Sequence, residues 1–141
     1  MRTLHVGIRV ADLDRSLAFY GALGYEVLGS VPETEFGSLT MIKLPDDPFV
    51  SLELVHDPSR GAVDPGGLNH VVIQTPDLRL TVDSLAGKGI EAREPACLDE
   101  ETHFWTSWVT DPDGYGIELV QWPAGHPEGM TAADLQAGPV D

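Results

Sequence analysis

Two histidines and two glutamates in this sequence combine residue types and a spacing that could support metal chemistry. Glu118 lies among apolar residues in the segment YGIELVQ, and Glu53 has the same setting in SLELV. The interval along the chain from His5 to His70 is equal to the interval from Glu53 to Glu118. A lone glutamate can sit on an exposed strand face, but a buried carboxylate costs several kcal/mol unless something binds it. Because both residue types repeat at one interval, the four residues are candidate metal ligands.

The interval from His5 to His70, which we call the duplication interval, relates other parts of the chain as well. Asp12 corresponds to Asp77 and Gly24 to Gly89, and several apolar positions match without a gap. We interpret this pattern as an internal duplication. The organisation it predicts is a first module at 1–57, a linker at 58–67, a second module at 68–122 and a C-terminal tail at 123–141.

Local patterns predict one order of elements, βαβββ, in both copies, and therefore an α+β fold. Residues 4–10 alternate between apolar side chains and His5, Gly7 and Arg9, which is the period of a strand with two different faces. The first copy is expected to contain strands at 4–10, 25–31, 39–44 and 49–55, with a helix from about Asp12 to about Leu23. The second is expected to contain strands at 70–75, 90–93, 105–110 and 115–121, with a helix at 78–86. A short helix is expected at 131–135, in a tail that is mobile or packs on a partner.

Residues of like parity in these strands share a face, which groups the candidate ligands with other side chains. His5 lies with Arg9, and His70 lies with Gln74. If each copy curls into a half-barrel, these rows and the rows that carry the two glutamates line one cavity wall. Two imidazoles and two carboxylates suit a first-row divalent cation, whereas a structural zinc site usually recruits cysteine.

Composition limits the classes of partner. The 141 residues are 42% hydrophobic and 22% charged, which is ordinary for a globular chain, and the net charge is −15. Such a charge repels nucleic acid and anionic membranes, and no apolar run approaches the roughly 20 residues of a membrane span. Cys97 is the single cysteine, so an internal disulfide is impossible. We expect a cytoplasmic protein.

At these residues the sequence resembles the vicinal oxygen chelate superfamily, and within it glyoxalase I (lactoylglutathione lyase). The resemblance covers nearly all of the chain up to Trp122 and rests on LHVGIRVADLDRSLAFYGALGYEV, SLELV, NHVVI and DPDGYGIELVQ. It implies two βαβββ modules whose half-barrel sheets are flanked by helices, and a homodimer with composite sites. The four metal positions of the family fall on His5, Glu53, His70 and Glu118.

The resemblance also implies a reaction. A hemithioacetal, formed from a 2-oxoaldehyde such as methylglyoxal and a low-molecular-weight thiol, is isomerised to an S-2-hydroxyacyl thiol. Glu118 is the expected base, and Glu53 can serve on the opposite face of a pseudo-symmetric site. One divalent ion is expected per site; similarity to the shorter bacterial glyoxalases favours Ni²⁺ or Co²⁺, and Zn²⁺, Fe²⁺ or Mn²⁺ also suit nitrogen and oxygen donors.

Four further residues are candidates for binding the substrate. Arg9 matches the position where the family binds a carboxylate of the thiol substrate. Many glyoxalases carry Asn at the position of Asp57, and a carboxylate there would repel glutathione, so another thiol stays open. Gln74 shares a face with His70, and Trp105 could wall the pocket for an apolar group of the substrate, although core or dimer packing is the alternative.

Other functions in the superfamily remain open. Related methylmalonyl-thioester epimerases usually carry Gln at the place of Glu53, and ring-cleaving extradiol dioxygenases have no ligand there. Bleomycin-binding relatives lack the metal residues and sequester a toxic compound without turnover. The complete His/Glu/His/Glu set therefore favours the glyoxalase interpretation. Oxygen consumption with Fe²⁺, proton exchange at a thioester α-carbon, or tight binding by metal-free protein would indicate the others.

Overall fold

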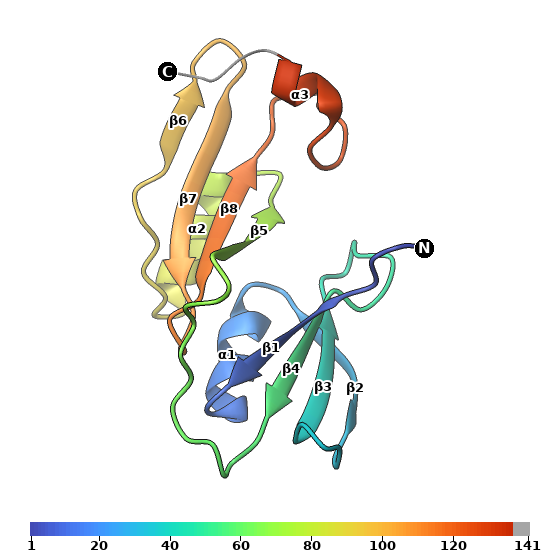
Figure 1. The fold of residues 1–141 in the computed structure, drawn as a ribbon. Helices are drawn as coiled ribbons and strands as arrows, with labels where there is room; N and C mark the ends of the chain where they lie inside the picture. Colours follow the sequence, from blue (N-terminus) through green and yellow to red (C-terminus); the bar gives the residue numbers. More distant parts are fainter. Residues whose placement is uncertain (137–141) are drawn as a thin grey trace. The chain divides into compact units, whose positions relative to one another are not determined.

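The computed structural model of this chain describes residues 1–136, and contacts within it define two units, which we describe one at a time (Figure 1). Unit 1 comprises residues 1–69 and 110–115, and unit 2 comprises, among the described residues, 70–109 and 116–136. The last five residues of the tail predicted at 123–141 lie outside the described residues.

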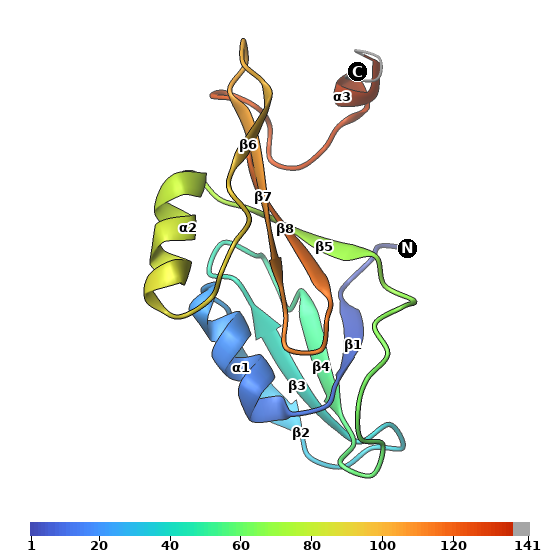
Figure 2. The same cartoon turned by 90° about the vertical axis from the view of Figure 1, so that its left-hand side faces the viewer.

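Unit 1 contains one helix and a four-stranded mixed sheet. Its elements are β1 (Val6–Val10), α1 (Leu13–Ala22), β2 (Glu26–Val31), β3 (Ser38–Lys43) and β4 (Leu52–His56). The strand order is β1-β4-β3-β2, in which β1 runs parallel to β4 and the other neighbours are antiparallel. The views in Figures 1 and 2 show α1 against one face of this sheet. The expected βαβββ order of the first copy is confirmed.

Alternation along the strands divides unit 1 into a buried face and a more open face. Ile8 and Val10 of β1 are buried, as are Ile42 of β3 and Leu54 of β4. These side chains and the buried aromatic residues of α1 form the apolar core of the unit. The Asp12 carboxylate accepts a hydrogen bond from the backbone N–H of residue 15 at 3.0 Å, which caps the helix as the sequence predicts.

Unit 2 repeats this plan. It contains β5 (His70–Gln74), α2 (Leu78–Gly87), β6 (Ala96–Asp99), β7 (Phe104–Thr110, whose last residue is assigned to unit 1) and β8 (Gly116–Gln121). The strand order is β5-β8-β7-β6, and β5 runs parallel to β8 just as β1 runs parallel to β4. Asp77 caps α2 through the backbone N–H of Leu80 at 3.0 Å. Both units are open sheets, and together they confirm the α+β class with two βαβββ modules.

One strand of unit 2 lies downstream of its expected place. The sequence predicted a strand at 90–93, but the strand β6 begins at Ala96, after Pro95. The backbone N–H of Ile90 bonds to the carbonyl of Leu85 at 2.9 Å and so closes the end of α2 instead of pairing with a strand. Within the predicted range, the backbone N–H of Arg93 donates to the carbonyl of Trp108 at 2.9 Å. A local pattern of alternating residues could not reveal that the end of the helix uses the backbone N–H of Ile90.

The described part of the tail makes contacts within its own unit, and the expectation that the tail is mobile or packs on a partner stays a prediction. It contains α3 (Ala132–Gln136), one residue later than predicted. The imidazole of His126 stacks on the Trp122 ring, with centroids 4.2 Å apart, and its Nε2 lies 2.8 Å from Asp134 Oδ1. Among the residues described, none of the helices is both long enough and apolar enough to span a bilayer.

Candidate metal centre and substrate pocket

His5 and Glu53 form a pair on the open face of unit 1. Gly7 is in register with Glu53 across the parallel strands β1 and β4, and His5 precedes Gly7 by two residues, so it shares that face. The Nε2 atom of His5 lies 3.4 Å from Oε2 of Glu53, and the two side chains are 34% and 18% exposed. A Cβ atom at Gly7 would lie 3.4 Å from Oε1 of Glu53, so glycine leaves the space above this carboxylate open.

His70 and Glu118 form the equivalent pair in unit 2. Val72 is in register with Glu118 across β5 and β8, and His70 again precedes that position by two residues. The Nε2 atom of His70 lies 3.5 Å from Oε2 of Glu118, with 33% and 20% of the side chains exposed. The same register at both places follows from the duplicated parallel pairing, which the constant duplication interval in the sequence reflects.

Two neighbours of the second pair were not identified from the sequence. The hydroxyl of Thr106 donates to Oε1 of Glu118 at 2.9 Å, and the ring of Trp108 packs edge-on against the His70 imidazole, with centroids 5.1 Å apart. Thr106 and Trp108 have the same parity in β7, so they share one face of that strand. The sequence signal that could have found them was their shared parity in the strand predicted at 105–110, taken together with the duplication interval.

Each pair fits a divalent cation in donor type and spacing. Imidazole nitrogen and carboxylate oxygen suit first-row divalent metals. Adjacent ligands about 2.1 Å from one ion lie roughly 3.0–3.4 Å apart, close to the separations found in both pairs. Within the described residues, no three His, Cys, Asp or Glu side chains gather to hold an ion. A pair alone therefore provides fewer protein ligands than the three usual at a catalytic metal.

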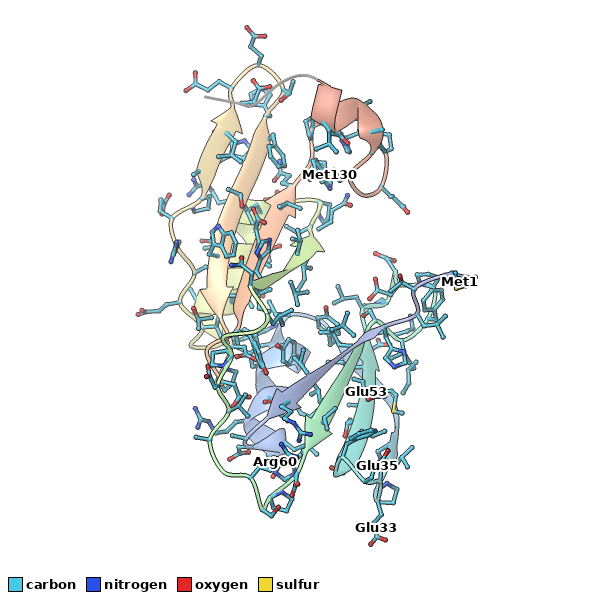
Figure 3. The ribbon with its side chains drawn as sticks, viewed as in Figure 1. Met1, Glu33, Glu35, Glu53, Arg60 and Met130 are labelled. Carbon is cyan, nitrogen blue, oxygen red and sulfur yellow. The ribbon has the colours of Figure 1, made fainter. Side chains whose placement is uncertain are left out.

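A cavity of about 430 Å³ lies in unit 1 beside β1 and the segment that follows β4. Arg9 of β1 and Arg60 of that segment supply two cationic side chains to its lining, which also includes Asp64 and Tyr115. The tyrosine hydroxyl donates to the Arg9 carbonyl at 3.0 Å and so ties the segment after β7 to the wall of the cavity. Figure 3 shows Glu53 on β4 and Arg60 in the segment after that strand. This volume and these charges suit a small anionic ligand.

Asp57 is paired within its own turn. Its Oδ1 accepts hydrogen bonds from the backbone and the hydroxyl of Ser59, at 3.0 and 2.7 Å, and its Oδ2 lies 3.5 Å from Nε of Arg60. The Ser59 hydrogen bonds, with smaller effects of Arg60 and Arg9, hold the pKa of Asp57 below its usual value. The carboxylate that was expected to repel glutathione is therefore accompanied by two arginines.

The other two candidates for substrate binding lie on unit 2. Gln74 is exposed on β5, on the same face as His70 and Val72. Trp105 is half-buried in β7, and strand alternation places it on the face opposite Thr106 and Trp108. The structure therefore places Trp108, and not Trp105, beside the imidazole of a candidate ligand.

Comparisons with known proteins agree with this architecture. Residues 2–119 match the model of the Glyoxalase/Bleomycin resistance protein/Dioxygenase superfamily. A probable lactoylglutathione lyase of Synechocystis is 36% identical over 86% of this chain and 95% of its own. A Brassica oleracea protein named as a lactoylglutathione lyase is 33% identical over 99% of this chain, which spans only 51% of that relative. The structure of the trypanothione-dependent glyoxalase I of Leishmania major is 30% identical, with a TM-score of 0.69 and 86% of each chain covered.

The match to the family model covers residues of both units, including all four residues of the two His/Glu pairs. The chain belongs to the Glyoxalase/Bleomycin resistance protein/Dioxygenase superfamily.

Proposed function

We propose that this protein is a metal-dependent isomerase of the glyoxalase I type. Its substrate would be the hemithioacetal of a 2-oxoaldehyde, such as methylglyoxal, with a low-molecular-weight thiol, and its product an S-2-hydroxyacyl thiol. The observation that carries the proposal is the repeated His/Glu pair, at 3.4 and 3.5 Å, in a chain whose relatives are named lactoylglutathione lyases.

His5, Glu53, His70 and Glu118 would hold one divalent ion, with Ni²⁺ or Co²⁺ favoured and Zn²⁺, Fe²⁺ or Mn²⁺ compatible. Because each pair offers only two protein donors, we propose that a second copy of the chain completes the site in a homodimer. When bound, the ion supplies Lewis-acid stabilisation to the negative charge that develops on the oxygens of the substrate.

The residues of the chain would perform the proton transfers. Glu118 accepts the proton from C1 of the hemithioacetal and returns it to C2. C1 is thereby oxidised to the thioester while C2 is reduced to the alcohol, so no redox cofactor is needed. Glu53 presents an equivalent carboxylate and can act on the opposite face. Arg9 and Arg60 line a cavity of about 430 Å³ and would bind a carboxylate of the thiol through charge-assisted hydrogen bonds.

The charges around that cavity favour one class of thiol. Asp57 is paired with Arg60 and Ser59, so it does not present an uncompensated negative charge to the ligand. A thiol that carries a carboxylate, such as glutathione, therefore fits better than a neutral thiol. The Leishmania relative is trypanothione-dependent, so the thiol has to be identified by experiment.

The test is an activity assay on metal-stripped protein that is restored with one metal at a time. Methylglyoxal is premixed with glutathione in one series and with other cellular thiols in another, and thioester formation is measured. We expect activity only with metal, and a loss of at least about 100-fold in Glu118→Gln. Glu94→Gln removes the same charge at an exposed site paired with Arg79 and is the matched control. Metal binding without turnover of any thiol adduct would contradict the proposal.

A further inference from the structure

The two His/Glu pairs have the same register but different neighbours. In unit 2 the Thr106 hydroxyl donates to Oε1 of Glu118 at 2.9 Å. The residue equivalent to Thr106 in the first copy is Met41, which is in register with Glu53 and offers no hydrogen-bond donor in its side chain. The duplication therefore preserved the ligands and changed the residue beside each carboxylate.

The difference affects how firmly each carboxylate is oriented. The terminal torsion of a glutamate is broad, so an unbound carboxylate samples many orientations. In Glu118 both oxygens have partners, since Thr106 bonds to Oε1 and Oε2 faces His70 at 3.5 Å. In Glu53 only Oε2 faces a histidine, and among the described residues no donor is found for Oε1. Thr106 is buried, and its hydrogen bond to Glu118 is partly shielded from competition by water.

The two histidines also differ in how firmly their surroundings hold them, and again the one in unit 2 has the closer neighbour. The imidazole of His70 is flanked by the Trp108 ring. The residue equivalent to Trp108 is Lys43, whose Nζ donates to three backbone carbonyls at 2.9 to 3.1 Å in the turn after β3. Its ammonium group is thus used to close that turn. Unit 2 holds both members of its pair with side chains from one face of β7, and unit 1 has no such arrangement at the matching positions.

We infer that Thr106 is a positioning residue, which fixes the Glu118 carboxylate so that its Oε2 and the His70 Nε2 form the preorganised half of the metal centre. Partners of this kind set the orientation of a ligand, and their loss typically lowers metal affinity or activity about 10- to 100-fold. The inference rests on the proposed function for turnover, because a base must keep its accepting oxygen in a fixed place. Its consequence for metal binding can be measured without turnover.

Co²⁺ is the probe for that measurement, by calorimetry and by its visible absorption, on the metal-stripped chain. We expect Thr106→Val, which keeps the shape of the side chain, to weaken Co²⁺ binding about 10-fold or more, and Thr106→Ser to restore it to near the wild-type value. Ser107→Ala is the matched control on the opposite face of β7. It removes a hydroxyl that donates to the Arg93 carbonyl at 2.6 Å, and it should lower stability without changing Co²⁺ affinity.

The kinetic arm uses the same variants in the thiol-adduct assay. Thr106→Val should lower kcat about 10-fold or more with little change in KM, and Thr106→Ser should recover most of the loss. If the wild type binds Co²⁺ but turns over no adduct, the proposed function fails while the binding arm still decides the role of Thr106. Wild-type affinity in Thr106→Val, equal losses in the Ser and Val variants, or the absence of Co²⁺ binding by the wild type would each overturn the inference.

Discussion

Tyr20 donates a buried hydrogen bond of 2.8 Å to the carboxylate of Asp111, although the two residues lie far apart in the chain. The same carboxylate accepts the backbone N–H groups of Asp113 and Tyr115, each at 2.9 Å. Both side chains are nearly inaccessible, and burial raises the pKa values of Tyr20 and Asp111. The turn DPDGY is thus held in unit 1 by the Asp111 carboxylate, a buried polar group that needs hydrogen-bond partners.

Tyr20→Phe should therefore destabilise the protein by about 1–3 kcal/mol, because it leaves one oxygen of a buried carboxylate without its donor. The free energy of unfolding, measured by urea titration, gives this value. Combining Tyr20→Phe with Asp111→Asn should show a coupling energy of at least about 0.5 kcal/mol. Additive effects of the two changes would mean that the hydrogen bond contributes nothing specific.

The pairing of His5 with Glu53 illustrates which features of the site could be predicted from the sequence. Strict alternation at residues 4–10 predicted a strand with the histidine on its polar face, and the duplication interval predicted the same geometry in the second copy. The structure then places these two side chains 3.4 Å apart, because β1 runs parallel to β4 in register. Patterns of period two are readable since they depend on neighbours in one strand.

Features that depend on partners in other segments were not readable. A threonine in a strand is ordinary, and Thr106 gains its meaning only when β7 lies beside β8 and brings its hydroxyl to Glu118. Arg60 lies in a segment rich in turn formers, without periodicity, yet it lines the cavity beside β1. The expected strand at 90–93 fails for the same reason, since the N–H of Ile90 bonds to the preceding helix.

The two arginines of the cavity give a prediction about substrate affinity. Arg9→Gln and Arg60→Gln should each raise KM for the glutathione adduct about 10-fold or more with little effect on kcat, because each removes a charge-assisted hydrogen bond. The adduct of an uncharged thiol such as 2-mercaptoethanol should be unaffected. Arg79→Gln, on the exposed surface of unit 2, is the control. Equal losses with the charged and uncharged adducts would assign the arginines a structural role.

Asp57 provides the opposite test, through its ion pair with Arg60, which lines the cavity. Asp57→Asn retains an oxygen that can accept from Ser59, and it removes the negative charge beside Arg60. We expect KM for the glutathione adduct to fall several-fold, because Arg60 no longer shares its charge with a carboxylate. Steady-state kinetics over a range of thiol concentrations would measure this change. A higher KM would show that the Asp57 pair is needed to hold Arg60 in place.

His126 and Asp134 give the tail a defined pH range in which it is held. Hydrogen bonding to Asp134 raises the pKa of His126, so this contribution is present below the ordinary histidine value and is lost as pH rises through the raised pKa. Hydrogen bonds from Thr131 and His126 lower the pKa of Asp134 to about 2, so its contribution is present above the ordinary aspartate value and is lost as pH falls toward 2. The two contributions overlap from about pH 4 to the raised pKa of His126.

Amide hydrogen exchange in residues 127–135 should therefore be slowest within this range and should accelerate above it, after correction for the intrinsic dependence on pH. His126→Phe keeps a ring that can stack on Trp122 but carries no proton, so it should remove the acceleration at high pH. Glu128→Gln changes a nearby exposed charge outside the His126–Asp134 pair and should leave the profile unchanged. If the His126→Phe profile matched that of the wild type, the imidazole would not be the group that holds the tail, and the stacked ring at Trp122 would be sufficient on its own.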